Sequence, residues 1–333
     1  MTLAAKVVLK NAEKIRMQLL RKGLVDAHYH ARREGDFLYI PLKKKAAGVD
    51  CVSFVFEEKK EKSTLETELR KILNEKELRQ LPRSQEIIGD IMILEIPNEL
   101  RRKERAIAQV FLKANKHIAT IVKKSKIHSG IYRTRKVTVL AGEKKKEAVH
   151  RENGCLIRVH IEKMYFSARL AHERQRIATL VKPKEHVLVM FSGCAPYVCV
   201  IAKKSRAQVT GIEINPEAHK YAEMNVQRNK LERVTLYQGD VRKILPRLGK
   251  FDRVIMPLPK TGEEFLPLAF THVKPKGIIH YYVFLREEEI ASYKKKIKEM
   301  CAAAKKKCRV LGVVKAGQHA PYVFRMCFDV KVR

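Results

Sequence analysis

The fold class is decided by the stretch Val187-Leu188-Val189-Met190-Phe191-Ser192-Gly193-Cys194-Ala195-Pro196, followed along the chain by Val209-Thr210-Gly211-Ile212-Glu213-Ile214. The apolar run at 187–191 has the length of a strand that is buried on both faces. Ser192 and Gly193 interrupt this run, and Pro196 can open a helix because its missing N–H would be unpaired there anyway. The order strand, turn, helix, strand predicts a βαβ unit of an α/β protein.

Glu213 indicates what this unit binds. It lies 20 positions after Gly193, at the end of the second strand, where an acidic side chain can bind a ribose diol. No G-x-G-x-x-G sequence precedes the helix, which makes a nicotinamide dinucleotide a weaker candidate. A βαβ unit without any ligand is the alternative at this point.

The charge of the chain points to a polyanionic partner. The 333 residues include 70 Lys and Arg against 36 Asp and Glu, a formal net charge of +34. Such a charge opposes folding by self-repulsion and favours nucleic acid as a partner. A membrane surface, or adaptation of the source organism to heat, are the alternatives.

Other compositional features suggest the cellular setting. No apolar run reaches the ~18 residues of a membrane-spanning helix, and the N-terminus does not resemble a signal peptide. The seven cysteines form no C-x-x-C, and no His/Cys cluster has zinc spacing. We therefore expect a cytoplasmic protein without a structural metal or a membrane contact.

The length and the pattern of elements predict three domains. Residues 1–60 read as a small α+β domain, with strands at 6–9, 37–41 and 52–56 and a helix capped by Asn11. Residues 61–150 read as a linking α+β domain. Its basic segment, residues 123–136, suits a loop that lies along phosphates, although a solvated surface is the alternative. Residues 151–333 form the α/β domain.

The α/β domain continues with further strands at 234–237, 253–256 and 277–284 and a closing strand pair at 310–314 and 323–330. Five βα steps that end in a strand pair are typical of a methyltransferase sheet. Asp240, just past the third strand, can accept from an amine such as that of adenine. Pro257 and Pro259 fix the backbone at the edge of the sheet where ligands bind.

Upstream, Arg169 and Glu173 are four residues apart on a helix predicted to be capped by Ser167. An ordinary surface ion pair is the alternative interpretation of these two residues.

Together these motifs resemble the archaeal and eukaryotic-type tRNA (guanine37-N1)-methyltransferases over most of the chain. The matching segments are Tyr132-Arg133-Thr134-Arg135, Leu140-Ala141-Gly142-Glu143, His150-Arg151-Glu152-Asn153-Gly154, Tyr165-Phe166-Ser167-Ala168-Arg169-Leu170 with Glu173-Arg174, Met190-Phe191-Ser192-Gly193, Glu213-Ile214-Asn215-Pro216, Gly239-Asp240-Val241 and Met256-Pro257-Leu258-Pro259-Lys260. The resemblance implies a class I, Rossmann-like methyltransferase domain that binds S-adenosylmethionine, preceded by the linking domain and by an N-terminal domain that contacts the outer corner of tRNA.

The resemblance also implies a role for each residue. Glu173 would remove the proton from guanine N1, Arg169 would stabilise charge on O6, and Tyr165 would help hold the flipped base. The implied cofactor-binding residues are Phe191, Gly193, Glu213, Ile214, Asp240, Val241 and Met256. The implied substrate-binding residues are Arg133, Arg174, Pro257, Pro259 and Lys260. The substrate that the resemblance implies is the tRNA anticodon loop, and we expect a monomer without a protein partner.

Three positions depart from the family pattern. Val189 and Ala195 stand where an Asp and a Gly are common, and Pro257 stands where an Asn is expected. Two alternative functions follow: a wybutosine-pathway enzyme that transfers an aminocarboxypropyl or methyl group at tRNA position 37, or a catalytically silent tRNA-binding paralogue.

Overall fold

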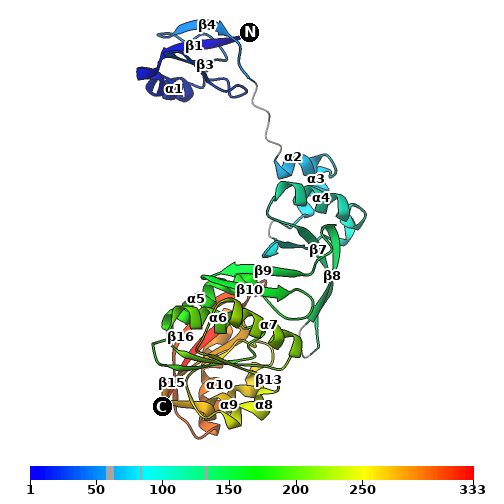
Figure 1. Ribbon diagram of the computed structural model, residues 1–333, viewed down its shortest axis with the longest axis vertical. Helices are drawn as coiled ribbons and strands as arrows, with labels where there is room; N and C mark the ends of the chain where they lie inside the picture. The colour runs from blue at the N-terminus through cyan, green and yellow to red at the C-terminus, as the bar shows by residue number, and fades with distance from the viewer. Residues whose placement is uncertain (58–63, 83–84, 131, 133) are drawn as a thin grey trace. The chain divides into compact units, whose positions relative to one another are not determined.

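The computed structural model describes residues 1–57, 64–82, 85–130, 132 and 134–333 (Figure 1). The chain divides into two compact units, Met1–Thr64 and Leu65–Arg333. Each unit has its own apolar core, so each is described separately. Among the described residues, no helix is both long enough and apolar enough to cross a membrane.

The first unit is a four-stranded antiparallel sheet with one α-helix. Its elements are β1 (Thr2–Val8), α1 (Ala12–Arg21), β2 (Arg32–Glu34), β3 (Phe37–Pro41) and β4 (Asp50–Phe54), with strand order β2-β3-β1-β4. Ala5, Leu19 and Ile40 are buried between the helix and the sheet. Asn11 precedes α1 as predicted, but its side chain makes no capping bond, because the residue is itself helical, with φ −112° and ψ 0°.

The second unit begins with a mixed sheet covered by helices. Its elements are α2 (Leu65–Arg70), α3 (Glu75–Gln80), β5 (Glu86–Ile88), β6 (Ile91–Leu94), α4 (Glu104–Ala114), β7 (Thr120–Ser129) and β8 (Thr134–Gly142), with strand order β5-β6-β7-β8. Leu69 of α2 and Ile107 and Phe111 of α4 pack on Ile121 of the sheet.

The basic segment 123–136 is not the predicted loop. Most of it belongs to β7 and β8, which pair antiparallel from Thr120 opposite Gly142 to Ser129 opposite Thr134. The sequence suggested a loop because lysines are rare in strands. The antiparallel pairing of β7 with β8 satisfies the backbone of this segment along one side, since β6 pairs with β7 only up to Lys123. This pairing overrides the weak strand propensity.

The rest of the second unit is the predicted α/β domain. A hairpin of β9 (Glu147–Glu152) and β10 (Cys155–His160) leads to α5 (Ala171–Leu180). The elements that follow are β11 (His186–Met190), α6 (Pro196–Lys204), β12 (Gln208–Glu213), α7 (Pro216–Arg228), β13 (Val234–Gln238), α8 (Val241–Ile244), β14 (Phe251–Met256), α9 (Leu266–His272), β15 (Val273–Leu285), α10 (Ile290–Ala303), β16 (Cys308–Ala320) and β17 (Val323–Val332). The strands predicted here are confirmed, and β15 and β16 extend well beyond the predicted bounds 277–284 and 310–314.

The seven strands have the order β13-β12-β11-β14-β15-β17-β16. β11 pairs in parallel with both β12 and β14, so the chain runs outward from β11 in two directions. In open α/β sheets such a switch point is where ligands bind, beyond the carboxyl ends of the strands. Val187 and Val189 of β11 belong to the core under α5, α6 and α7, while Leu188 and Met190 belong to the core under α8, α9 and α10. Helices thus cover both faces of the sheet (Figure 1), which confirms the predicted Rossmann-like architecture.

Candidate active site

The turn between β11 and α6 has the backbone shape of a glycine-rich loop. Phe191, Gly193 and Ala195 have φ of 59°, 58° and 65°. The left-handed region is unfavourable for a residue with a Cβ atom, by about 1 kcal/mol or more. Ala195 nevertheless adopts it, fully buried at the N-cap of α6. The substitution of the second glycine therefore preserves the course of the backbone, and the chain tolerates the strain.

Glu213 closes this turn from the neighbouring strand. Its carboxylate accepts from the N–H of Gly193 at 2.7 Å and from the N–H of Asn215 at 2.8 Å. Burial raises the pKa of Glu213, and the backbone N–H donors oppose that rise. Since each carboxylate oxygen can accept more than one bond, acceptor capacity remains for a ribose diol at the switch point. This end of the site fits the cofactor.

The methionine end of the site differs. Val189 is fully buried among apolar residues and brings no charge. Beside it, the hydroxyl of Ser192 is the one buried side-chain oxygen or nitrogen without a hydrogen-bond partner among the described residues. An unsatisfied buried hydroxyl next to a turn with positive φ is consistent with a polar ligand group there.

The residues predicted for the adenine side lie around the same edge of the sheet. Asp240 caps α8 through the N–H of Arg242 and also pairs with the Arg242 guanidinium at 2.7 Å. This hydrogen-bonded pairing lowers the pKa of Asp240. An adenine amine would have to share the carboxylate with Arg242. Phe191 packs edge-on against Phe265, with ring centroids 4.9 Å apart.

The other predicted cofactor-binding residues have apolar side chains. Met256 and Val241 are buried, and Ile214 is half-buried after β12. Beyond β14, Pro259 is buried, Pro257 is half-buried and Lys260 is exposed. Arg133 lies outside the described residues.

The catalytic segment differs from the predicted helix in one respect. Residues Ala168–Leu170 form a 3₁₀ turn, and α5 begins only at Ala171. Ser167 makes no capping bond with its side chain. Arg169 is exposed whereas Glu173 is buried, so the two side chains do not share the predicted common face.

Arg169 is exposed and faces the preceding sheet. The pKa of Glu95, next to β6, is lowered first by its hydrogen bond to Lys124 and further by the charge of Arg169. Tyr165 is half-buried, and its hydroxyl accepts from Arg325 of β17 at 2.9 Å.

Arg174 is not placed to bind substrate. It is 1% exposed and forms a two-pronged ion pair with Glu152 of β9, at 2.5 Å for each hydrogen bond. Its third partner is the carbonyl of Ser167, at 3.0 Å. With these contacts Arg174 ties α5 to the β9–β10 hairpin. The motif could not distinguish this structural role from a role in substrate binding.

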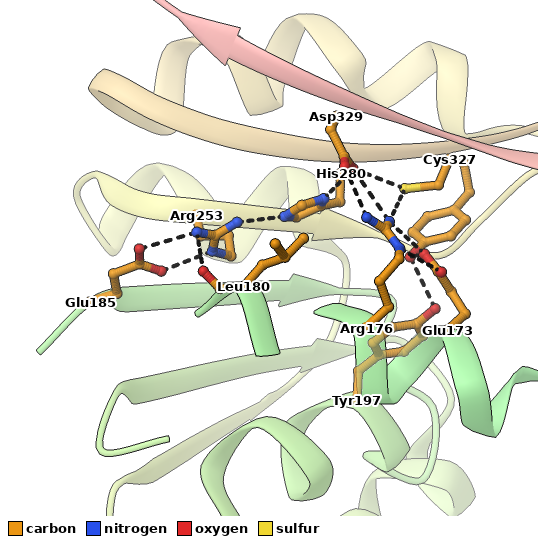
Figure 2. A network of polar contacts seen from close by, with 10 residues as sticks. Glu173, Arg176, Leu180, Glu185, Tyr197, Arg253, His280, Cys327 and Asp329 are labelled. Atoms are coloured by element: carbon orange, nitrogen blue, oxygen red, sulfur yellow. Dashed lines mark hydrogen bonds and ion pairs between the residues drawn. The ribbon is translucent and has the colours of Figure 1, made fainter. Parts of the chain in front are cut away.

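Glu173 is 3% exposed and accepts three hydrogen bonds. Arg176 donates to both of its oxygens at 2.8 Å, and the hydroxyl of Tyr282 donates to Oε1 at 2.5 Å (Figure 2). The sequence analysis did not find these two partners. Arg176 lies three residues further along α5 and was a detectable candidate, but Tyr282 lies 109 positions away and gives no signal in the sequence.

The strand order, the turn after β11 and the buried acid at the end of β12 define a class I methyltransferase. The chain belongs to the TRM5/TYW2 methyltransferase family, whose methyltransferase-domain model matches residues 148–311. The model of the TYW2 N-terminal domain matches residues 65–145, and that of the tRNA methyltransferase 5 N-terminal domain matches residues 4–50.

Individual relatives agree with this assignment. The chain is 38% identical to the tRNA (guanine(37)-N(1))-methyltransferase Trm5b of Pyrococcus abyssi, over 100% of this chain and 99% of that one. A crystal structure of that protein superposes with a TM-score of 0.84, covering 100% of this chain and 99% of the other at 37% identity. A structure described as the complex of aTrm5 and tRNALeu gives 0.85 at 27% identity, covering 99% of this chain and 100% of that one. A tRNA(Phe) (4-demethylwyosine(37)-C(7)) aminocarboxypropyltransferase of Pyrococcus horikoshii is 31% identical over 79% of this chain and 94% of that one.

Proposed function

We propose that the protein transfers a methyl group from S-adenosylmethionine to N1 of guanosine 37 in the anticodon loop of tRNA. The similarity to guanosine-37 methyltransferases over the full length of both chains supports this reaction. The aminocarboxypropyltransferases match a smaller part of the chain.

The proposed domain division follows the predicted one: 1–60 contacts the outer corner of tRNA, 61–150 links, and 151–333 carries out the transfer. The separation of the first 64 residues as a compact unit, and the different family models that match 65–145 and 148–311, support it. Since tRNA is modified where it is used and matured, we place the protein in the cytoplasm.

The residues of the site provide what the reaction needs. Guanine N1 carries a proton at neutral pH, so a base must remove it as the new bond forms. Glu173 takes this proton, Arg169 stabilises the negative charge that develops on O6, and Tyr165 and Arg133 hold the base. Glu213 binds the cofactor ribose. When bound, S-adenosylmethionine supplies a methyl group already activated by its sulfonium sulfur, so alignment of the reactants provides much of the remaining acceleration.

The observation that carries this proposal is the buried, fully oriented carboxylate of Glu173 in the segment that leads to the cofactor turn. Glu173→Gln should slow single-turnover transfer of labelled methyl to a tRNA transcript by about 10²-fold or more. Affinity for tRNA should change by less than about threefold, because the substitution keeps the shape of the side chain. Glu299→Gln, at an exposed position of α10, is the matched control and should transfer at the wild-type rate. Undiminished transfer by Glu173→Gln would remove Glu173 from the role of base.

The aminocarboxypropyl transfer is the second candidate, favoured by the matching TYW2 N-terminal domain at 65–145 and by the uncharged Val189. The mass of the modified nucleoside distinguishes the two products. Saturable binding of S-adenosylmethionine in a calorimeter would also exclude a silent tRNA-binding protein that has lost its cofactor site.

A further inference from the structure

A chain of buried and partly buried polar side chains runs from Glu185, just before β11, to Glu173 and beyond it (Figure 2). It crosses β14, β15 and β17 and ends on α5 and α6. Its members, in order of contact, are Glu185, Arg253, His280, Asp329, Arg176, Glu173, Tyr282 and Tyr197. The proposed mechanism uses only Glu173 of these eight.

Arg176 joins two carboxylates. Through Nε and Nη2 it binds both oxygens of Glu173 at 2.8 Å, and through Nη1 it binds Oδ2 of Asp329 at 2.9 Å. Burial opposes the charge of Arg176, but the hydrogen bonds from its guanidinium to Glu173 and Asp329 raise its pKa above the usual value. Arg176 is therefore a permanent cation shared by two acids.

His280 fixes the second acid. Its Nε2 lies 2.7 Å from Nη1 of Arg253, and an arginine can only donate, so Nε2 accepts and the proton is on Nδ1. Nδ1 lies 2.6 Å from Oδ1 of Asp329 and donates to it. Although burial raises the pKa of Asp329, His280 and Arg176 together hold it well below its usual range. Asp329 is thus an ionised and immobile anchor for Arg176.

The two oxygens of Glu173 are not equivalent. Oε1 accepts from Arg176 and from Tyr282, whose hydroxyl in turn accepts from Tyr197 at 3.2 Å. Oε2 accepts from Arg176 alone among the described residues. Since a carboxylate oxygen has two lone pairs, Oε2 is the atom that retains capacity for a proton.

The same place has the donor set of a metal site, because His280, Cys327 and Asp329 offer ligand atoms within 4.8 Å of one another. Arg176 already donates to Cys327 Sγ at 3.2 Å and to Asp329. A guanidinium therefore occupies the position of the cation, and the cluster serves to hold Arg176.

We propose that Arg176 and Asp329 are positioning residues for the base: Asp329 fixes Arg176, and Arg176 orients the Glu173 carboxylate so that Oε2 receives the proton of guanine N1. The inference rests on the proposed function, in which Glu173 is the base. The N1–H bond breaks, the proton moves to Oε2, and the electron pair stays on N1 for the new bond to the methyl carbon. The bond between that carbon and the cofactor sulfur would break at the same time, with its electron pair left on sulfur.

The electrostatics of this arrangement predict opposite effects for the two positioning residues. The charged and titratable groups that face Glu173 are Arg176 of α5, Tyr282 and His280 of β15, Cys327 and Asp329 of β17, and Tyr197 of α6. Burial raises the pKa of Tyr282 and of Cys327 far above neutrality and lowers that of His280, so all three stay uncharged at neutral pH. Only Arg176 and Asp329 carry charge beside Glu173 in this set.

The first test is Asp329→Asn, which keeps the shape and removes the negative charge. The positive charge of Arg176 then acts on Glu173 alone and favours its ionised form. The acidic limb of the pH profile of single-turnover methyl transfer should move to lower pH by about half a unit to one unit. The weaker base should lower the plateau rate about three- to tenfold, with the S-adenosylmethionine Kd unchanged.

The second test is Arg176→Gln, which removes the cation between the two acids. Glu173 then lies near the negative charge of Asp329 with no cation between them, so the acidic limb should move to higher pH by about one unit or more. Arg176→Lys keeps the charge and loses the two-pronged contact. Its limb should stay close to that of the wild type while its plateau rate falls, and it serves as a second variant if Arg176→Gln does not fold.

Glu185→Gln is the matched control, since it weakens a buried ion pair at the far end of the same chain, with Arg253. It should lower the melting temperature and leave the acidic limb in place. Limbs that coincide with the wild type in both Asp329→Asn and Arg176→Gln, or that move in the same direction, would overturn the inference. Its failure is distinct from failure of the proposed function, because Glu173→Gln would then still slow transfer by about 10²-fold or more.

Discussion

At the scale of single residues, two neighbouring positions of α5 have different roles. Glu173 and Arg174 are neighbours in the sequence and are both buried. Glu173 contacts Arg176 and Tyr282, while Arg174 contacts Glu152 on the opposite side. Successive residues of a helix point about 100° apart, so one residue can serve chemistry and the next can serve the fold.

Arg174→Met tests this separation. It leaves Glu152 buried without its cation, and breaking a buried pair in this way costs about 3–5 kcal/mol. Chemical denaturation should show that loss, whereas tRNA affinity of the folded variant should stay within about threefold of the wild type. The double variant Arg174→Met with Glu152→Gln should recover part of the stability. A drop in tRNA affinity without a change in stability would instead show that Arg174 binds the substrate.

At the scale of elements, β8 is attached directly to the catalytic segment. Arg135 is buried and donates to the carbonyl of Ile161 and to Glu86, each at 3.2 Å. The N–H of Val137 donates to Glu162 at 2.8 Å. The basic β7–β8 hairpin thus ends on the residues that precede Tyr165, so hairpin and active site are mechanically connected.

Arg135→Met should loosen this attachment. The variant loses both hydrogen bonds and leaves Glu86 beside an apolar side chain. We expect this to lower the free energy of local opening of β8 by about 2 kcal/mol, which raises its opening equilibrium constant about 30-fold. Hydrogen exchange of β8 amides should accelerate by that factor, while amides of the central strand β11, which pairs with both β12 and β14, stay protected. The rate of methyl transfer at low tRNA concentration should fall, with S-adenosylmethionine binding unchanged. Unaltered exchange in β8 would contradict the attachment.

At the scale of the whole molecule, charge governs the encounter with tRNA. The net charge of +34 is distributed over both units, and binding to phosphates releases the counterions that surround the RNA. Binding of the small cofactor depends on a few enclosed contacts, such as those of Glu213, and not on the net charge of the protein.

The tRNA affinity should therefore fall by about 10³-fold between 50 and 200 mM salt. Filter binding with a tRNA transcript measures this slope, and calorimetry with S-adenosylmethionine over the same range is the control, which should change little. A tRNA affinity that is nearly independent of salt would show that base contacts and shape, instead of phosphate charge, dominate binding.

The sequence by itself determined the βαβ unit, the succession of strands typical of methyltransferases and the family, and it predicts Glu213 as the acid that binds the cofactor ribose. These follow from local patterns: short apolar runs, glycine and proline at turns, and an acid at a fixed spacing. Only the tertiary structure decided that most of the basic segment 123–136 belongs to β7 and β8, that Ala195 keeps the shape of a glycine turn, and that Arg169 and Glu173 point to different partners. It also decided that Arg176, Tyr282 and Asp329 surround Glu173. These contacts join residues on β15 and β17 to α5 across more than a hundred positions of sequence. No local pattern encodes such contacts, because they depend on how strands and helices pack.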